Sequence, residues 1–281
     1  MSLTPGPTSH LEEVCVGDEH GGAGPGEDGP LGELLRRAGA RKLEEMPLDL
    51  EVEIQEHLRR AGDHIVPHLA PGLESGDPRT RMKVATYLGQ VGTPACEAPL
   101  LRGLEDPDPR VRLLSVISLR DCGLLSSAEP LLAVLDDPDP RVCGAAADAL
   151  AVLTNHAHDC NPFHPPEHRQ AAAGRLRGWL VERRGRTREE LLVEGFREAG
   201  YPLEDLSAGW SALIEALGAP QPCVRRNAEQ ILGELCGARR TMAQELIEVN
   251  PAGHLTYEEA RREALRRLQA FYRRRLEPGG R

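Results

Sequence analysis

The sequence has few aromatic side chains and no long apolar run. Aromatic residues make up 3% of the 281 residues, whereas hydrophobic residues together make up 40%. The core must therefore consist mainly of Leu, Ala and Val, and Leu and Ala favour helices. Few segments combine β-branched and aromatic residues with strand-like alternation. No apolar run approaches the ~20 residues that a membrane-spanning helix requires. We therefore expect an all-α protein without a membrane span.

The sequence also lacks an excess of positive charge, since 34 Lys and Arg stand against 44 Asp and Glu. The net charge is −10, so the sequence lacks the positive balance that is typical of nucleic-acid-binding proteins. The charge is also uneven along the chain. Residues 1–60 hold thirteen acidic and six basic residues, whereas residues 257–281 hold eight Arg and four Glu. The overall balance disfavours nucleic acid as a partner.

The seven cysteines form neither a CxxC motif nor an even set. Cys122 and Cys143 fall inside apolar helical patterns, where a free thiol acts as a small hydrophobic group. This usage is typical of a reducing compartment. The first fifteen residues lack the basic and apolar regions of a secretory signal. We therefore expect a cytoplasmic protein.

An internal repeat organises the middle of the chain. Asp-Pro-Arg occurs at Asp77, Asp108 and Asp139, which are equally spaced, and this gives the chain a 31-residue register. Apolar positions keep the same spacing, namely Leu88, Leu119 and Leu150, Leu100 with Leu131, and Leu104 with Leu135. Spacing this regular predicts a stack of similar units.

Each unit is predicted to be a pair of helices. The carboxylate of Asp108 can accept the free N–H groups of a first helical turn, and Pro109 suits the first helical position. A helix is expected from residue 111 until Gly123 breaks it, and a second helix is expected over 128–137. A pair of about 30 residues cannot cover its own apolar face, so neighbouring pairs must stack.

The segment DPDPRVRLLSVISLRDCGLLSSAEPLLAVLDDPDPRVCGAAADALAVL resembles bacterial HEAT repeats of the short kind, which are also found in phycobiliprotein lyases. The resemblance covers about residues 63–155. It implies an α-solenoid whose concave surface is lined by the second helix of each pair. It also implies that Arg81, Arg112 and Arg225 contact a neighbouring repeat.

The repeat is interrupted once and then resumes. Pro162 stands where the register predicts an apolar residue, and the register returns later in the chain, where Leu213 aligns with Leu131. Because proline removes a backbone donor, the segment 155–168 is expected to be non-helical. The predicted organisation is a disordered Gly/Pro/acidic tail over 1–30, HEAT-like repeats over 31–155, a Pro- and His-rich loop over 156–168, and a second HEAT-like block with an Arg-rich closing helix over 169–276.

The predicted working surface is the concave face. Polar positions of the second helices are expected to contact a protein partner there, and these are Glu97, Arg102, Glu129 and Asp136. No cofactor is expected. Two aromatic side chains of the Arg-rich helices, Trp179 and Phe271, are interpreted as anchors of those helices to the core.

Six metal-ligand residue types gather in the interrupting loop, namely His156, His158, Asp159, Cys160, His164 and His168. Zinc favours Cys and His. However, the spacing matches no standard zinc finger. The preferred interpretation is a polar loop whose side chains satisfy helix ends, with a metal site as the alternative.

The sequence lacks the signatures of the enzymes that use this repeat. Deoxyhypusine hydroxylases carry His-Glu pairs, and no His-Glu dipeptide occurs here. The lyases have no short signature that can be placed on this chain. A nucleic-acid-binding solenoid needs a basic stripe on successive helices, and none is evident. We therefore expect a non-enzymatic protein-binding scaffold or adaptor in the bacterial cytoplasm. The alternatives are a lyase-type or metal-dependent enzyme, and a nucleic-acid-binding protein.

Overall fold

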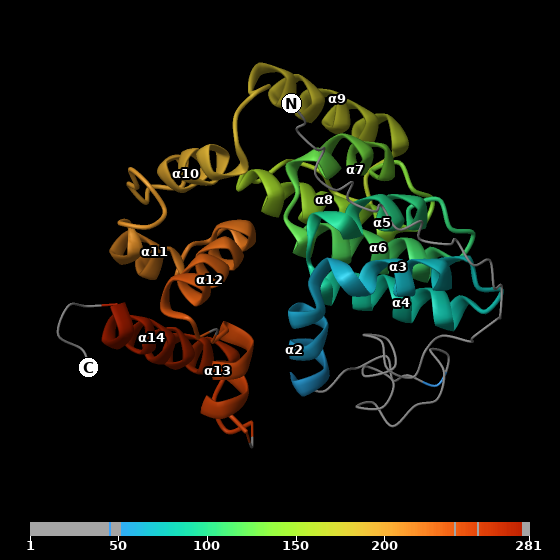
Figure 1. Cartoon of the computed structure of the whole chain (residues 1–281). Coiled ribbons are helices and arrows are strands. Elements are labelled where there is room, and N and C mark those ends of the chain that lie inside the picture. Colours follow the sequence, from blue (N-terminus) through green and yellow to red (C-terminus); the bar gives the residue numbers. More distant parts are fainter. Residues whose placement is uncertain (1–44, 46–51, 239, 252, 277–281) are drawn as a thin grey trace, which may run out of the picture.

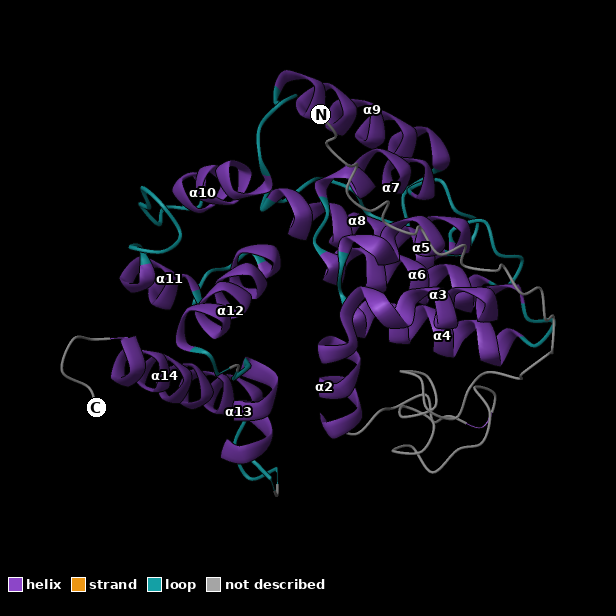
Figure 2. Ribbon diagram, viewed as in Figure 1, coloured by secondary structure: helices purple, strands orange, loops and turns teal. Residues whose placement is uncertain are grey.

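The computed structural model describes residue 45, residues 52–238, 240–251 and 253–276. Helices are the regular elements in this part of the chain, and it contains no strand (Figure 2). The all-α prediction is confirmed. The predicted tail over 1–30 lies outside the described residues, as does the start of the first predicted block.

From α4 to α8 the helices follow one another in pairs joined by short turns (Figure 1). Their bounds are α2 Val52–Ala61, α3 Val66–Leu69, α4 Pro78–Val91, α5 Glu97–Gly103, α6 Pro109–Cys122, α7 Ala128–Val134, α8 Pro140–Thr154, α9 Pro166–Glu182, α10 Arg188–Glu198, α11 Trp210–Ala216, α12 Pro222–Cys236, α13 Met242–Val249 and α14 Tyr257–Leu276.

The Asp-Pro motifs begin the first helix of three successive pairs. The Asp108 carboxylate accepts a hydrogen bond from the Arg110 backbone N–H at 2.8 Å, and Asp139 does the same with Arg141 at 2.9 Å. Asp77 caps α4 in the same way. Gly123 ends α6 in the left-handed conformation, with a φ of 70° that favours glycine. The predicted Asp-Pro starts of these three helices and the predicted end of α6 at Gly123 are confirmed, and α6 begins at Pro109, two residues before the expected start.

The first helices of the pairs form one continuous layer. Helices α4, α6 and α8 stack directly on one another, whereas α5 packs on α6 and α7 on α8. Leu88, Leu119 and Leu150, which share one register position, are each fully buried. The predicted 31-residue register is therefore confirmed by burial.

Ion pairs between repeats follow the same register. Arg81 binds Asp106 and Arg112 binds Asp137, and in each case the acceptor lies in the turn that leads to the next unit. The equivalent position of the next repeat is Cys143, and Arg169 from α9 reaches the same region there. Its Nη1 donates to the Asp137 carbonyl at 3.4 Å. Arg169 thus replaces the hydrogen bond that Arg112 donates to the Asp106 carbonyl in the preceding unit, but not the ion pair.

The interruption at Pro162 separates α8 from α9, as predicted. Residues 155–165 are non-helical, and α9 begins at Pro166, slightly earlier than the predicted end of the loop. The loop carries the chain across the end of the stack so that α9 packs on α7.

A buried polar cluster joins the two blocks of the chain. The Asn227 amide of α12 donates to the Val152 carbonyl at 3.0 Å and to Asn155 Oδ1 at 2.9 Å. The Asn155 amide in turn donates to the Leu192 carbonyl of α10. Gly195 of α10 leaves the room for this contact, since a Cβ there would lie 2.2 Å from the Asn155 carbonyl oxygen.

The stack bends into an open arc (Figure 1). Helix α2 at one end and α13 near the other face each other across the middle of the arc. The stacked layer of α4, α6 and α8 lies toward the inside. In the described part of the chain, no helix has both the length and the apolar character needed to span a membrane.

Candidate functional site

The inside of the arc contains a polar hollow of about 740 Å³. Its lining comes from α2, α4, α6, α8, α12 and the start of α13. We refer to it below as the central hollow. Five of its lining residues occupy one equivalent position in successive units, namely Arg59, Gln90, Asp121, Val152 and Glu234. The first four follow one another at the repeat interval, and Glu234 corresponds to Val152 as Leu213 corresponds to Leu131.

Charged side chains from distant helices meet beside the central hollow. Arg120 of α6 donates to Asp148 Oδ2 at 2.9 Å, and Arg226 of α12 donates to the same oxygen at 3.2 Å. At the other side, Arg59 Nη2 of α2 donates to Gln90 Oε1 of α4 at 3.3 Å. These contacts hold side chains of both blocks in place around one space.

The central hollow is lined by the C-terminal ends of the first helices α4, α6 and α8, and no residue of the second helices α5 and α7 lines it. The predicted binding residues Glu97, Arg102, Glu129 and Asp136 instead lie on or next to α5 and α7, in the outer layer.

Three of those four residues contact neighbouring helices. Glu97 accepts hydrogen bonds from Ser126 and Ser127, Glu129 pairs with Arg177 at 2.9 Å, and Asp136 accepts from Gln170 at 3.0 Å. Arg102 is exposed on α5. Their part in binding a partner stays a prediction.

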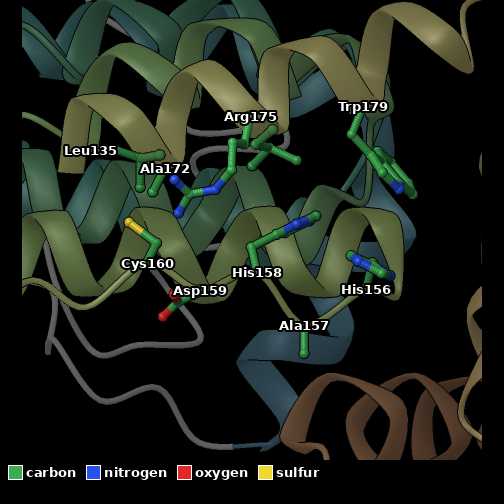
Figure 3. A pocket seen from close by; sticks show the side chains of 10 residues that line it. Leu135, His156, Ala157, His158, Asp159, Cys160, Ala172, Arg175 and Trp179 are labelled. Carbon is green, nitrogen blue, oxygen red and sulfur yellow. The ribbon is translucent and has the colours of Figure 1, made fainter. Parts of the chain in front are cut away.

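The His-rich loop builds a small pocket against α9. It has a volume of about 190 Å³, and Figure 3 shows loop residues on one side and Ala172, Arg175 and Trp179 of α9 on the other. The His156 ring stacks on Trp179 with centroids 5.2 Å apart, and the His158 ring meets it edge-on at 5.7 Å. Trp179 is thus an anchor for both α9 and the loop.

The two histidines of this pocket are held by polar neighbours. His156 Nδ1 lies 2.9 Å from the Glu198 carboxylate of α10. His158 Nε2 lies 2.9 Å from the Thr154 hydroxyl at the end of α8. Burial lowers the pKa of His158 to about 4, and the charge of His156 contributes to the same shift. The ring of His158 is therefore neutral at neutral pH.

The six potential ligands of the loop do not converge. Among the described residues, no group of three or more His, Cys, Asp and Glu side chains is placed to hold a metal ion. His156 and His158 face Trp179, whereas His164 and His168 pair with each other at a centroid distance of 5.8 Å. The interpretation as a polar loop and its alternative, a metal site, both stay predictions.

Sequence reasoning missed two features of the structure, one in the central hollow and one in the core of the second block. The lining position of the central hollow could have been found, because Arg59, Gln90 and Asp121 share the 31-residue register. The other feature is Tyr272 of α14, which is fully buried and whose hydroxyl donates to the Arg240 carbonyl at 2.7 Å. The neighbouring Phe271, predicted as the anchor, is only partly buried.

Comparison with known proteins identifies the repeat. Residues 66–151 match the family described as HEAT repeats. No curated protein matches the chain.

Among solved structures, human deoxyhypusine hydroxylase in complex with glycerol is similar with 18% identity and a TM-score of 0.36, covering 87% of this chain and 99% of that one. A designed armadillo repeat protein is similar with 14% identity and a TM-score of 0.30, covering 72% of this chain and 98% of that one. The 31-residue register, the stacked helix pairs and the family match together show that residues 66–151 consist of HEAT repeats, within a chain whose described part has an α-solenoid fold.

Proposed function

We propose that this protein is a non-enzymatic scaffold or adaptor that holds a segment of a partner protein in the central hollow. The observation that carries the proposal is the row of equivalent positions that lines the hollow, from Arg59 through Gln90, Asp121 and Val152 to Glu234. A repeat that places one side chain per unit in a common space forms a linear series of contacts.

The spacing of this row suits an extended polypeptide. Packed helices lie about 8–10 Å apart, and an extended chain advances about 3.3 Å per residue. Each unit would therefore meet about every third residue of a bound segment. The amide of Gln90 can both donate and accept a hydrogen bond, which suits the polar groups of a peptide backbone.

The charges of the row favour protein over nucleic acid. Arg59 is cationic, Gln90 neutral, Asp121 anionic, Val152 apolar and Glu234 anionic. A phosphate backbone requires a continuous series of basic side chains, and this row alternates in character. A partner with mixed charge is the better match. We propose that it meets this protein in the bacterial cytoplasm, consistent with the cysteine usage.

The proposal is tested by site-specific crosslinking. A photoreactive p-benzoylphenylalanine is placed at Gln90 in the central hollow or at Arg102 on the outer layer, and crosslinked proteins are identified by mass spectrometry. We expect one partner to be captured from Gln90. The purified partner is then titrated by calorimetry against the wild type and against a hollow variant, Gln90→Ala with Asp121→Ala, which should bind roughly tenfold more weakly.

A matched variant of the outer layer distinguishes the two faces. Charge reversal by Arg102→Glu with Glu129→Arg alters the residues that the sequence predicted, and leaves the central hollow unchanged. If this variant weakens the complex and the hollow variant does not, the partner lies on the outer layer and the hollow proposal is wrong.

A further inference from the structure

A second groove of about 630 Å³ lies outside the central hollow, between α7, α9 and the turn that leads to α10. We call it the outer groove. Among the described residues that line it, four are arginines and one is a carboxylate. The arginines are Arg177, Arg183, Arg184 and Arg186, and the carboxylate is Glu129.

Two of the arginines are held in place by the same carboxylate. Arg183 Nη2 and Arg186 Nη1 lie 2.9 and 2.7 Å from the two oxygens of Glu194. The guanidinium of Arg183 also lies 4.0 Å from the centre of the Trp179 ring, a cation–π contact that fixes its plane. Arg183 also lies 3.6 Å from the exposed Glu182 carboxylate, so Glu194 is the less exposed of the two carboxylates that balance these guanidinium groups.

The other two arginines, Arg184 and Arg177, carry positive charge that a partner can reach. Arg184 is exposed on the turn. Arg177 pairs with Glu129 at 2.9 Å, but these side chains are 51% and 63% exposed. An ion pair this exposed is worth about 0–1 kcal/mol, so a carboxylate from a partner can replace Glu129 at little cost. The groove is therefore prepared to accept negative charge.

The floor of the outer groove is aliphatic. Leu191 is buried beneath it, Leu125 and Leu180 are partly buried, and Val181 at its edge is 54% exposed. A large exposed aliphatic side chain beside fixed arginines gives the groove an apolar and a cationic part. Both parts belong to one continuous lining.

We propose that the outer groove binds an acidic polypeptide segment that carries an aliphatic side chain. Charge complementarity supplies the first half of the match, with Arg184 and Arg177 facing the carboxylates. Contact of the aliphatic side chain with Val181 and Leu180 supplies the second. Single-stranded nucleic acid binds by stacking its bases on aromatic rings, and Trp179 is already covered by His156 and Arg183. The proposal is independent of the partner in the central hollow.

The test uses a fluorescein-labelled peptide, Glu-Glu-Leu-Asp-Glu-Val, whose binding to the full chain is followed by fluorescence anisotropy. We expect saturable binding that Arg184→Glu weakens roughly tenfold through like-charge repulsion. Val181→Asp should weaken it by a similar factor, because it places a carboxylate at the apolar edge. Arg273→Glu, an exposed arginine on the distant α14, is the matched control and should leave binding unchanged.

Control peptides and a further variant show whether binding depends on the negative charge of the peptide and on the outer groove. A peptide with Gln and Asn in place of its acidic residues should not bind, and the hollow variant Gln90→Ala with Asp121→Ala should bind the probe like the wild type. The proposal is overturned by an absence of binding to the wild type, by equal losses in Arg184→Glu and Arg273→Glu, or by equal binding of the neutral peptide. Tighter binding of labelled oligothymidylate than of the peptide, lost in Arg184→Glu, would assign the groove to nucleic acid instead. Circular dichroism confirms that each variant is folded.

Discussion

The guanidinium of Arg112 holds the carboxylate of Asp137 across the boundary between two repeats. Nε donates to Oδ2 at 2.8 Å and Nη2 donates to Oδ1 at 3.0 Å, so the pair is bidentate. The two side chains are only 14% and 8% exposed. Nη1 donates to the Asp106 carbonyl at 2.8 Å. One side chain therefore ties together the two turns that flank its unit.

Loss of this arginine should destabilise the stack strongly. Arg112→Met leaves the Asp137 carboxylate nearly buried without its counter-ion, and we expect a loss of about 3 kcal/mol in the free energy of unfolding. Arg110→Met is the matched control in the same helix. Arg110 pairs with Asp108 at 2.7 Å but is 53% exposed, so solvent screens this pair and its loss should lower the free energy of unfolding much less. Urea denaturation measures the free energy of unfolding of both variants. Equal losses would show that the Arg112–Asp137 pair stabilises the protein no more than the exposed pair does.

Core truncation tests the 31-residue register. Leu119 is fully buried between helices, and Leu119→Ala should lower the free energy of unfolding by about 2–5 kcal/mol. Ile247 is 71% exposed on α13, and Ile247→Ala should change it by no more than about 0.5 kcal/mol. Thermal and urea unfolding of the two variants provide the comparison. A change at Leu119 as small as that at Ile247 would contradict the packing described above.

The buried amide at the junction should couple the two blocks. Asn227→Ala removes the hydrogen bonds to Val152 and Asn155 and leaves their oxygens unsatisfied, at a cost of about 1–3 kcal/mol. Hydrogen exchange should then become faster in α12, while α4 and α6 keep their protection. Asn161→Ala, in the exposed loop, is the control. Uniformly faster exchange in all helices would show instead that the chain unfolds as one unit.

Acid should weaken the protein through His158. The ordinary pKa of the side chain is 6.5, whereas the buried ring has a pKa of about 4. Above pH 6.5 the ring is neutral in both states. Between pH 6.5 and 4 the unfolded chain binds a proton that the folded chain does not, so stability falls as the pH falls, by an amount on the order of 3 kcal/mol.

A histidine variant isolates this contribution. His158→Gln should flatten the loss of stability between pH 6.5 and 4, as measured by urea denaturation at a series of pH values. The exposed His164→Gln should keep the wild-type profile. Identical slopes in the two variants would mean that other groups cause the acid sensitivity.

The sequence by itself determined the helices and their order. Asp-Pro caps, a terminating glycine and prolines in the interrupting loop act through local geometry, which needs no knowledge of distant residues. The 31-residue register placed Leu119 in the core because a repeated apolar pattern must face its own copies. The same register also shows that Arg59, Gln90, Asp121 and Val152 occupy equivalent positions. It does not show toward which side of the stack these positions face.

Only the tertiary structure decided which layer faces inward. Periodicity says which side chains share one face of a helix, but curvature depends on how closely each layer packs, and here α4, α6 and α8 stack more directly than α5 and α7. This moved the candidate site from Arg102 and Glu129 to Gln90 and Asp121. The replacement of the contact at Cys143 by Arg169 was equally hidden, because the arginine comes from a helix on the far side of the interrupting loop. Contacts between elements that no repeat relates to one another appear only when the chain is folded.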